Sequence, residues 1–499
     1  MSLWPDAATA TVERRGLRVY PDQPATVVGL IERSVAADPG APAVAEPGGP
    51  ALTYGELWEE AERVAGGLQA RGAAPGTRVA FLMANSIDLL VGVIACWRAG
   101  AVAVTLNTKY TLPELAKQLA ACAPLVVVSQ PEWLEKVDPQ QVPHLLSGID
   151  GLLGRFEPVP LTAADPALLM FTSGTTGSSK RALQSHLNLV SVAETYIRCL
   201  ELEPRTTTVV AAPMFNATGL NAQCLPVLAL GGTVTLMPRF HPEELVELLG
   251  EGKATLFHAA PTIYALTTGA AASRRARGLR VAVSGGSPVT RGLVERVREL
   301  APGVDFRISY GMTETSSPAV LTPPGWIDER PGDAAGVAVP VDDVGLGPDG
   351  EILFRGATVI AGYDGDVEAN ERSFLDGWLR SGDLGTIDED GFVTVLDRIK
   401  DVINRGGEKI PSIEVETALC EHPLVVEAAV VGVPHDVYGE VPRAFVAVSE
   451  PVGERELQAF ARERLAGFKV PAEIVFVEEL PRNPGGKVLK PLLRAESGA

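Results

Sequence analysis

The stretch Thr172-Ser-Gly-Thr-Thr-Gly-Ser-Ser-Lys180 directly follows an apolar segment, Ala167-Leu-Leu-Met-Phe171. The apolar segment predicts a buried strand, and the loop after it combines glycines, hydroxyl side chains and a lysine. Glycines let a backbone approach a ligand, amides and hydroxyls donate hydrogen bonds, and lysine adds a positive charge. The loop therefore predicts a polyphosphate site, although it does not match the Walker pattern GxxxxGK[ST]. A solvated Ser/Gly linker is the alternative that composition leaves open.

The composition is that of a large acidic chain. Its 499 residues are 46% apolar with a formal net charge of −19, which predicts several domains and argues against nucleic acid as a partner. The five cysteines lack CxxC spacing, which argues against disulfides or zinc and fits small core residues in a reducing cytoplasm. We find no secretory signal and no apolar stretch long enough for a membrane span. We therefore expect a cytoplasmic protein without a membrane partner.

Helical and strand patterns alternate along most of the chain, which predicts an α/β fold with mainly parallel sheets covered by helices. Thr53 is a predicted N-cap for a helix over 54–71, and strands are expected at 78–83, 101–106 and 125–128. From about Gly336 the pattern changes to short strands and turns, which predicts a small β-rich subdomain. After Asp397 the pattern is that of a compact α+β domain, with helices at 413–420 and 454–464.

Four further motifs follow the loop at large separations. They are Tyr310-Gly-Met-Thr-Glu-Thr315, Ser381-Gly-Asp-Leu-Gly385, the run from Asp397 to Ile410 and Pro481-Arg-Asn-Pro-Gly-Gly-Lys487. In this order the five motifs resemble those of the adenylate-forming superfamily of acyl-CoA synthetases, adenylation domains and luciferases. The resemblance covers nearly the whole chain. It is strongest to a free-standing acyl- or aryl-CoA ligase.

The resemblance implies an ATP site with Mg²⁺. By analogy, the Gly-rich loop holds the β- and γ-phosphates through Thr172, Ser173, Gly174, Thr175, Thr176, Gly177 and Lys180. Tyr310, Gly311 and Met312 would border the adenine, together with the small-residue loop Ser284, Gly285, Gly286 and Ser287. Thr313 would contact the α-phosphate, and Glu314 would supply the oxygen ligand that Mg²⁺ requires. Asp383 would accept hydrogen bonds from the ribose hydroxyls, and Arg398 would contact the same ribose.

The resemblance also implies two half-reactions served by domain motion. Lys487 would bridge the attacking carboxylate and the departing phosphates during adenylate formation. Lys400 would be the hinge about which a mobile C-terminal domain rotates. Gly406 and Gly407 would then line the tunnel for the thiol acceptor. The implied domains are residues 1–396 and 401–499, joined by a hinge at 397–400.

Two positions depart from the usual family pattern. Arg181 stands where relatives usually have glycine, and we expect its side chain to point to solvent rather than to phosphate. Asn216 stands in Pro213-Met-Phe-Asn216, where acyl-CoA ligases often carry histidine. The sequence therefore predicts the reaction more closely than it predicts the identity of the acid substrate.

The predicted acyl pocket contains no Asp or Arg, which favours an apolar, medium-chain, cyclic or aromatic acid over an amino acid or a dicarboxylate. Its predicted residues are Asn216, Ala217, Thr218, Gly219, Leu220, His258, Tyr264, Gly285, Gly286 and Met312. His258 is equally well explained as a core histidine.

The predicted activity is ATP-dependent ligation of a carboxylic acid to CoA through an acyl-AMP, with release of pyrophosphate. An amine or a carrier-protein pantetheine as acceptor is the alternative, and a non-catalytic nucleotide-binding regulator is a remote one. We expect a monomer or a homodimer.

Overall fold

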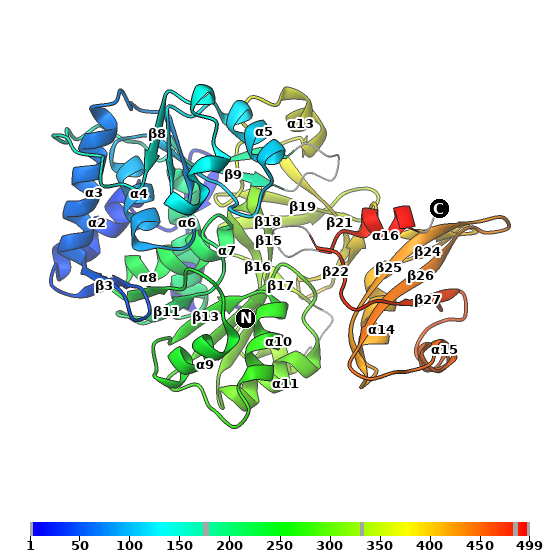
Figure 1. Cartoon of the computed structure of the whole chain (residues 1–499). Helices are drawn as coiled ribbons and strands as arrows, with labels where there is room; N and C mark the ends of the chain where they lie inside the picture. The colour runs from blue at the N-terminus through cyan, green and yellow to red at the C-terminus, as the bar shows by residue number, and fades with distance from the viewer. Residues whose placement is uncertain (1–2, 173–178, 330–333, 483–487, 497–499) are drawn as a thin grey trace. The chain divides into compact units, whose positions relative to one another are not determined.

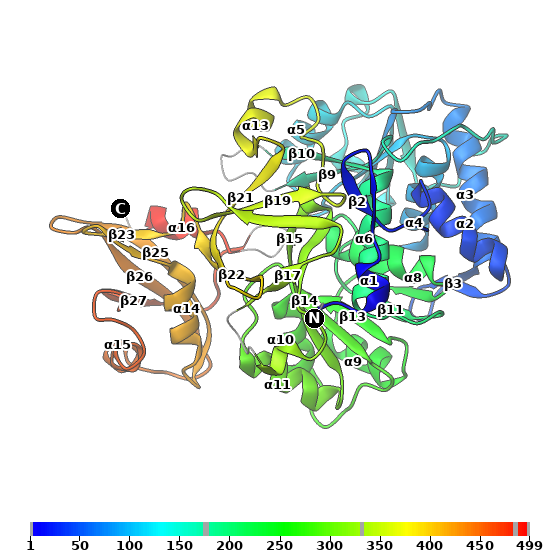
Figure 2. The ribbon, with the colours of Figure 1, turned by 180° about the vertical axis from the view of Figure 1, so that it is seen from behind.

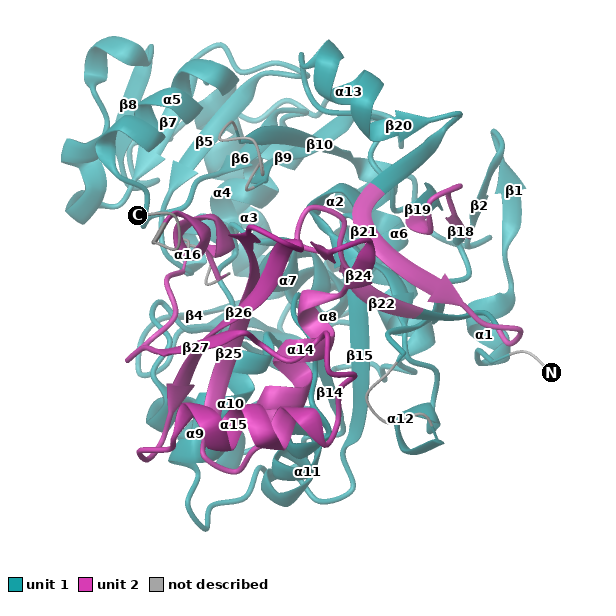
Figure 3. Ribbon diagram, turned by 90° about the vertical axis from the view of Figure 1, so that its right-hand side faces the viewer, with its two compact units in different colours: residues 1–344, 353–380, 391–393 teal, residues 345–352, 381–390, 394–499 magenta. Residues whose placement is uncertain are grey.

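The computed structural model describes residues 3–172, 179–329, 334–482 and 488–496. The chain divides into two compact units (Figure 3). The first comprises residues 1–344, 353–380 and 391–393, and the second comprises residues 345–352, 381–390 and 394–499. The predicted hinge at residues 397–400 falls inside the last segment of the second unit, and its role as a hinge stays a prediction.

The first unit contains a six-stranded sheet with the order β10-β9-β6-β5-β7-β8. Its strands are parallel except β10, which pairs antiparallel with β9. The inner strands are short runs of valine, alanine and leucine, as expected for strands covered on both faces. The bounds are β5 (Arg78–Leu82), β6 (Val102–Thr105), β7 (Val126–Ser129), β8 (His144–Ser147), β9 (Pro166–Thr172) and β10 (Lys180–Ser185).

One helix of the N-terminal region, α3, begins where the sequence predicts it. Thr53 caps α3 in a complete capping box, because its hydroxyl accepts from Glu56 N while the Glu56 carboxylate accepts from Thr53 N. The predicted N-cap is therefore confirmed. The helices here are α1 (Asp6–Thr9), α2 (Val27–Ala37), α3 (Tyr54–Gln69), α4 (Ile87–Arg98) and α5 (Leu112–Cys122), and a small hairpin joins β1 (Val12–Arg14) to β2 (Leu17–Val19).

A second sheet of 14 strands has at its centre the parallel strands β12, β11, β13, β14 and β15. Alternate residues of β11 face opposite layers: Val209 packs with the core of α9, α10 and α11, whereas Val210 packs with the core of α6 and α8. Figures 1 and 2 show α9, α10 and α11 grouped together, apart from α6 and α8. The strands up to β17 are β3 (Pro42–Ala45), β4 (Ala51–Thr53), β11 (Thr207–Val210), β12 (Thr233–Leu236), β13 (Leu256–Ala259), β14 (Val281–Gly285), β15 (Asp305–Met312), β16 (Ser317–Leu321) and β17 (Gly336–Ala338).

The covering helices include one segment of π-helix, the stretch Leu220–Cys224 called η3. The other helices are α6 (His186–Cys199), α7 (Ala217–Gly219), α8 (Leu225–Ala229), α9 (Pro242–Gly250), α10 (Pro261–Ala270), α11 (Arg291–Leu300) and α12 (Trp326–Glu329).

The predicted β-rich stretch is present between residues 336 and 398. It contains β18 (Asp342–Leu346), β19 (Glu351–Gly356), β20 (Phe374–Leu375), β21 (Trp378–Ile387) and β22 (Phe392–Arg398), with one helix, α13 (Val367–Ser373). In sequence, boundaries between the two units fall within β18, β19, β21 and β22.

The second unit also has its own α+β core, as predicted. Its sheet has the order β24-β23-β26-β25, with β27 beside β26, and its core includes Ile403, Ile410 and Val415. Its elements are β23 (Ile403–Arg405), β24 (Glu408–Ile410), α14 (Ser412–Cys420), β25 (Val425–His435), β26 (Gly439–Val448), α15 (Glu454–Arg462), β27 (Glu473–Phe476) and α16 (Lys490–Glu496).

Candidate active site

The predicted phosphate loop joins β9 to β10. Thr172 and Lys180 are register partners, as are Phe171 and Arg181, so the hairpin holds both ends of the loop together. The Lys180 ammonium lies 3.0 Å from Ser373 Oγ and 4.6 Å from the centre of the Tyr363 ring. The predicted residues Ser173, Gly174, Thr175, Thr176 and Gly177 lie outside the described residues.

Buried amides hold the backbone at Thr313. The Gln184 side-chain NH₂ donates to Thr313 O at 3.0 Å, and Asn221 donates to Gln184 Oε1 at 2.8 Å. The strand β15 ends at Met312, and a short 3₁₀ turn then carries Thr313 and Glu314. Neither Gln184 nor Asn221 was predicted, because both lie far from the motif in sequence.

The Glu314 side chain is nearly buried, with 8% of the residue exposed. Its Oε1 accepts a hydrogen bond from the Tyr363 hydroxyl at 2.7 Å, while its backbone oxygen accepts one from Ile360 N at 2.9 Å. Among the described residues, no hydrogen bond or ion pair is made to Oε2. The carboxylate thus has one oxygen anchored and one available to an ion.

The residues present fit a magnesium ion bound largely by nucleotide. In the described part of the chain, no three His, Cys, Asp or Glu side chains come together as a metal cluster. Mg²⁺ usually takes one or two carboxylates and completes its coordination with phosphate and water oxygens. Glu314, with its single anchored oxygen, matches that requirement.

The predicted adenine residues lie at the carboxyl ends of neighbouring parallel strands. Gly285 of β14 is the register partner of Ser309 of β15, and Tyr310 follows directly. The Tyr310 ring packs against Phe354 with ring centres 5.6 Å apart. Ser284 Oγ is buried with no described hydrogen-bond partner, whereas Ser287 is exposed at the end of the same loop with Gly286. Ligands commonly bind beyond such strand ends.

The predicted ribose residues meet each other in the second unit. Arg398 Nε lies 3.1 Å from Asp383 Oδ1, and the Asp383 side chain is 8% exposed. The Ser381 hydroxyl accepts a hydrogen bond from Asp383 N, and Gly382 O accepts one from Ile399 N. The Asp383 carboxylate and the Arg398 guanidinium, 15 positions apart in sequence, therefore form an ion pair beside the turn Ser381 to Gly385.

The predicted acid-binding residues separate into half-buried and core positions. Asn216 is half-buried at the start of α7, and its backbone oxygen accepts from Gly219 N and Leu220 N. Leu220 is fully buried, as is Tyr264, whose hydroxyl donates to Phe257 O at 2.8 Å. The Tyr264 ring contacts the rings of Phe257 and Phe306, and a pocket role for this buried residue stays a prediction.

His258 is a core histidine. It is 3% exposed, its ring lies 5.7 Å from that of Tyr196, and burial lowers its pKa to about 3. Its backbone N–H donates to Gln223 Oε1 of the π-helical segment. Of the two explanations that the sequence left open, burial favours the core one, with a neutral imidazole.

Acidification is expected to destabilise the protein through His258. The unfolded imidazole binds a proton near pH 6.5, whereas the folded one stays neutral down to about pH 3, so its contribution is complete above pH 6.5 and is lost as the pH falls. Between about pH 7 and pH 5 the loss should be about 2 kcal/mol. Urea unfolding of His258→Gln should show a correspondingly flatter pH dependence. The exposed His241→Gln is the control, and an unchanged slope in His258→Gln would contradict the expectation.

The predicted acceptor-tunnel glycines form the turn between β23 and β24. Gly406 and Gly407 have φ values of 62° and 99°, which other residues rarely adopt. Gly406 N donates to Tyr438 O at 2.7 Å. The predicted hinge residue Lys400 is exposed, and its backbone oxygen accepts from Arg494. Lys487 lies outside the described residues.

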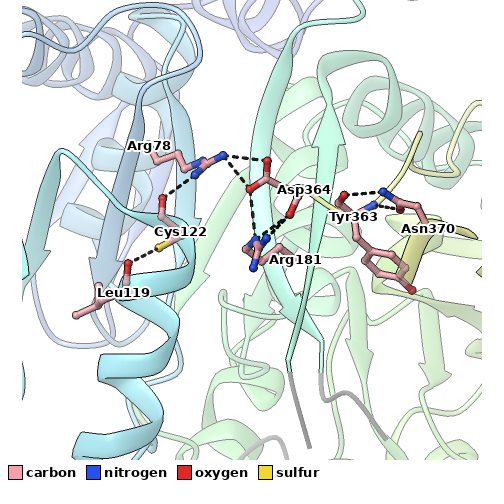
Figure 4. A network of polar contacts seen from close by, with 7 residues as sticks. All are labelled: Arg78, Leu119, Cys122, Arg181, Tyr363, Asp364 and Asn370. Carbon is pink, nitrogen blue, oxygen red and sulfur yellow. Dashed lines mark hydrogen bonds and ion pairs between the residues drawn. The ribbon is translucent and has the colours of Figure 1, made fainter. Parts of the chain in front are cut away.

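Arg181 does not point to solvent, so that prediction was wrong. Its side chain is 18% exposed and lies against Asp364, donating from Nε to the Asp364 backbone oxygen at 2.9 Å. The Arg78 guanidinium contacts the Asp364 carboxylate from the other side at 2.8 Å (Figure 4). The partner is 183 residues away in sequence, so no local pattern around Arg181 could reveal it.

Comparison with known proteins identifies the family. Residues 31–364 match the AMP-binding enzyme family, and residues 414–487 match the AMP-binding enzyme C-terminal domain. The chain belongs to the AMP-binding enzyme family. A feruloyl-CoA synthase from an Amycolatopsis species is 38% identical over 90% of this chain and 95% of its own length. A 2-succinylbenzoate–CoA ligase from Bacillus licheniformis is 35% identical over 88% and 94%.

Solved structures of family members share the fold. o-Succinylbenzoate CoA synthetase (MenE) from Bacillus subtilis, in complex with ATP and magnesium ion, has a TM-score of 0.85 and 31% identity, covering 94% of this chain and 99% of its own. The same enzyme with its acyl-adenylate OSB-AMP has a TM-score of 0.84. The predicted family, α/β fold and reaction class, an AMP-forming acid–thiol ligase that uses ATP, Mg²⁺ and CoA, are confirmed.

The prediction that the cysteines are core residues is confirmed for four of them. Cys96, Cys122, Cys199 and Cys224 are buried and free, as expected for core residues. Among the described residues, no helix combines the length and apolar character needed to cross a membrane.

Proposed function

We propose that this AMP-forming CoA ligase acts on an aromatic or cyclic acid that is largely apolar. The observation that carries the proposal is the lack of an Asp, Glu, Lys or Arg side chain at the predicted acid-binding positions, where the half-buried Asn216 is neutral. A second carboxylate or an ammonium would have no partner there, and burying an unpaired charge is costly. The names of the similar feruloyl-CoA and 2-succinylbenzoate ligases support a ring-bearing acid.

In the proposed site, Lys180 and the loop from Thr172 bind the β- and γ-phosphates, and Thr313 contacts the α-phosphate. Glu314 holds Mg²⁺, which neutralises phosphate charge when bound. The carboxylate oxygen of the acid attacks the α-phosphorus and pyrophosphate leaves, producing acyl-AMP. The CoA thiolate then attacks the acyl carbon and AMP leaves. Preorganised charge that stabilises the first of these transition states is the main contribution of such a site.

The remaining roles complete the proposal. Tyr310 and the loop Ser284 to Ser287 border adenine, Asp383 and Arg398 bind the ribose, and Gly406 with Gly407 border the acceptor thiol. Lys400 is the proposed hinge between residues 1–396 and 401–499. Lys487 is the proposed cation of the first half-reaction.

Product analysis tests the proposal. With ATP, Mg²⁺, CoA and a panel of acids, the protein is expected to release AMP and pyrophosphate, and ring-bearing monocarboxylates such as hydroxycinnamates should be the best substrates. 2-Succinylbenzoate, a dicarboxylate, should be poorer than ferulate. Omitting CoA should slow turnover after the first acyl-AMP forms. ADP as a product would exclude the reaction, and a preference for 2-succinylbenzoate would exclude the acid class.

A further inference from the structure

Tyr363 connects two elements of the proposed site that lie far apart in sequence. Its hydroxyl lies 2.7 Å from Glu314 Oε1, and its ring lies 4.6 Å from the Lys180 ammonium. The residue is only 5% exposed. Its aromatic and polar parts therefore contact the proposed phosphate-binding lysine and the proposed magnesium ligand at the same time.

The segment at 363–364 is held as an added edge of β10. Tyr363 bridges Ala182 in antiparallel fashion, and Asp364 N donates to Arg181 O at 2.9 Å. Asn370 bonds both the N–H and the carbonyl of Tyr363, at 2.6 and 2.9 Å (Figure 4). These bonds leave the backbone of Tyr363 little freedom.

Two arginines hold Asp364 beside it. Arg181 donates to the Asp364 backbone oxygen, and Arg78 binds its carboxylate at 2.8 Å while also donating to Cys122 O at 2.9 Å (Figure 4). The Asp364 side chain is 14% exposed, so these charge pairs are partly shielded from water and fix the segment better than surface pairs would. Arg181, at the position of the usual glycine, thus strengthens this attachment.

We infer that Tyr363 is a positioning residue that orients Glu314 toward Mg²⁺ and holds Lys180 beside the phosphate loop. The inference rests on the proposed roles of Glu314 and Lys180. A hydrogen bond to one carboxylate oxygen fixes the plane of the carboxylate and leaves the other oxygen for the metal, and such supporting partners strongly influence metal affinity. The aromatic face attracts the ammonium without supplying a negative charge that would compete with phosphate.

The hydroxyl is the donor in its contact with Glu314, because a carboxylate oxygen can only accept. The tyrosine therefore orients the carboxylate.

Two substitutions separate the two contacts. Tyr363→Phe removes the hydroxyl and keeps the ring, so it should raise the Mg²⁺ concentration for half-maximal ATP binding about tenfold, in the range known for lost supporting bonds. ATP binding in EDTA should be unchanged.

Tyr363→Leu also removes the ring. It should weaken ATP binding in EDTA about threefold, because the cation–π contact with the Lys180 ammonium is lost. Titration calorimetry with ATP and no acid measures both effects without turnover.

A matched control separates these effects from general destabilisation. The Tyr54 hydroxyl is also buried and donates to Leu228 O and Gly232 O, away from the proposed site residues in sequence. Tyr54→Phe should lower stability while leaving the Mg²⁺ dependence of ATP binding unchanged.

Glu314→Gln distinguishes the inference from the proposed function. If Glu314→Gln abolishes the Mg²⁺ dependence while Tyr363→Phe leaves it unchanged, the positioning role is wrong and the proposed metal ligand stands. If Glu314→Gln also binds ATP with normal Mg²⁺ dependence, the metal role of Glu314 is wrong and the inference falls with it. The inference is supported if the Mg²⁺ dependence of ATP binding shifts in Tyr363→Phe and does not shift in Tyr54→Phe.

Discussion

Lys487→Ala is expected to slow acyl-adenylate formation by about a hundredfold or more, since removing one preorganised charge contact from a transition state has effects of this size. In the proposed mechanism, Lys487 would bridge two negatively charged groups, the acid carboxylate and the departing phosphates. The reaction of presynthesised acyl-AMP with CoA should remain largely intact. Single-turnover measurements of the two half-reactions, followed separately, check both parts.

The control for this prediction is Lys253→Ala, which removes an exposed lysine of the first unit. Both half-reactions should keep their rates in that variant. An equal loss in the two half-reactions of Lys487→Ala would contradict the view that this lysine serves only adenylate formation. Lys487 follows Gly485 and Gly486 in the last motif, and the resemblance to the family is the basis for its role.

Gly311→Ala is expected to lower the free energy of unfolding by about 3 kcal/mol, the upper part of the range for overpacking. An added Cβ would lie 1.9 Å from Ser317 O and 2.8 Å from Thr315 Oγ1, at a bulge in the pairing of β15 with β16. A backbone oxygen cannot rotate away as a side chain can. The turn bearing Thr313 and Glu314 would have to move, and a displacement of about 1 Å can reduce activity about a hundredfold.

Gly269→Ala is the matched control, because an added Cβ at this position of α10 meets no atom within 4 Å. Replacing glycine by alanine inside a helix should leave stability unchanged or raise it by about 0.5–1 kcal/mol. Urea unfolding and pyrophosphate release measure the two variants. Wild-type stability in Gly311→Ala would show that the bulge can absorb a side chain, contrary to the geometry.

Most elements with strong local patterns were predicted close to their observed bounds. The strand at 78–83 is β5 (Arg78–Leu82), and the helix at 413–420 is α14 (Ser412–Cys420). The antiparallel strand β10, which includes Lys180, was missed. Its run Lys-Arg-Ala-Leu-Gln-Ser has little β propensity, and it is stabilised by pairing with β9 and with the segment at Tyr363.

The candidate site was predictable where its chemistry is contained in short motifs. Thr313 and Glu314 occupy a turn at the end of a strand, as their motif predicts, whereas the ion pair of Asp383 with Arg398 joins two different motifs and was not predicted. Tyr363 was missed, since it belongs to no motif with recognisable chemistry and lies 49 residues beyond Glu314.

The sequence by itself determined the reaction class and the positions of the five motifs, because glycine, hydroxyl and charged residues at fixed short spacing specify local backbone geometry and ligand chemistry. Only the tertiary structure decided the partners of Arg181, the burial of His258 and the connection of Glu314 to Tyr363. Contacts of this kind depend on which strands become neighbours. That is a property of the packed fold, and no local spacing records it.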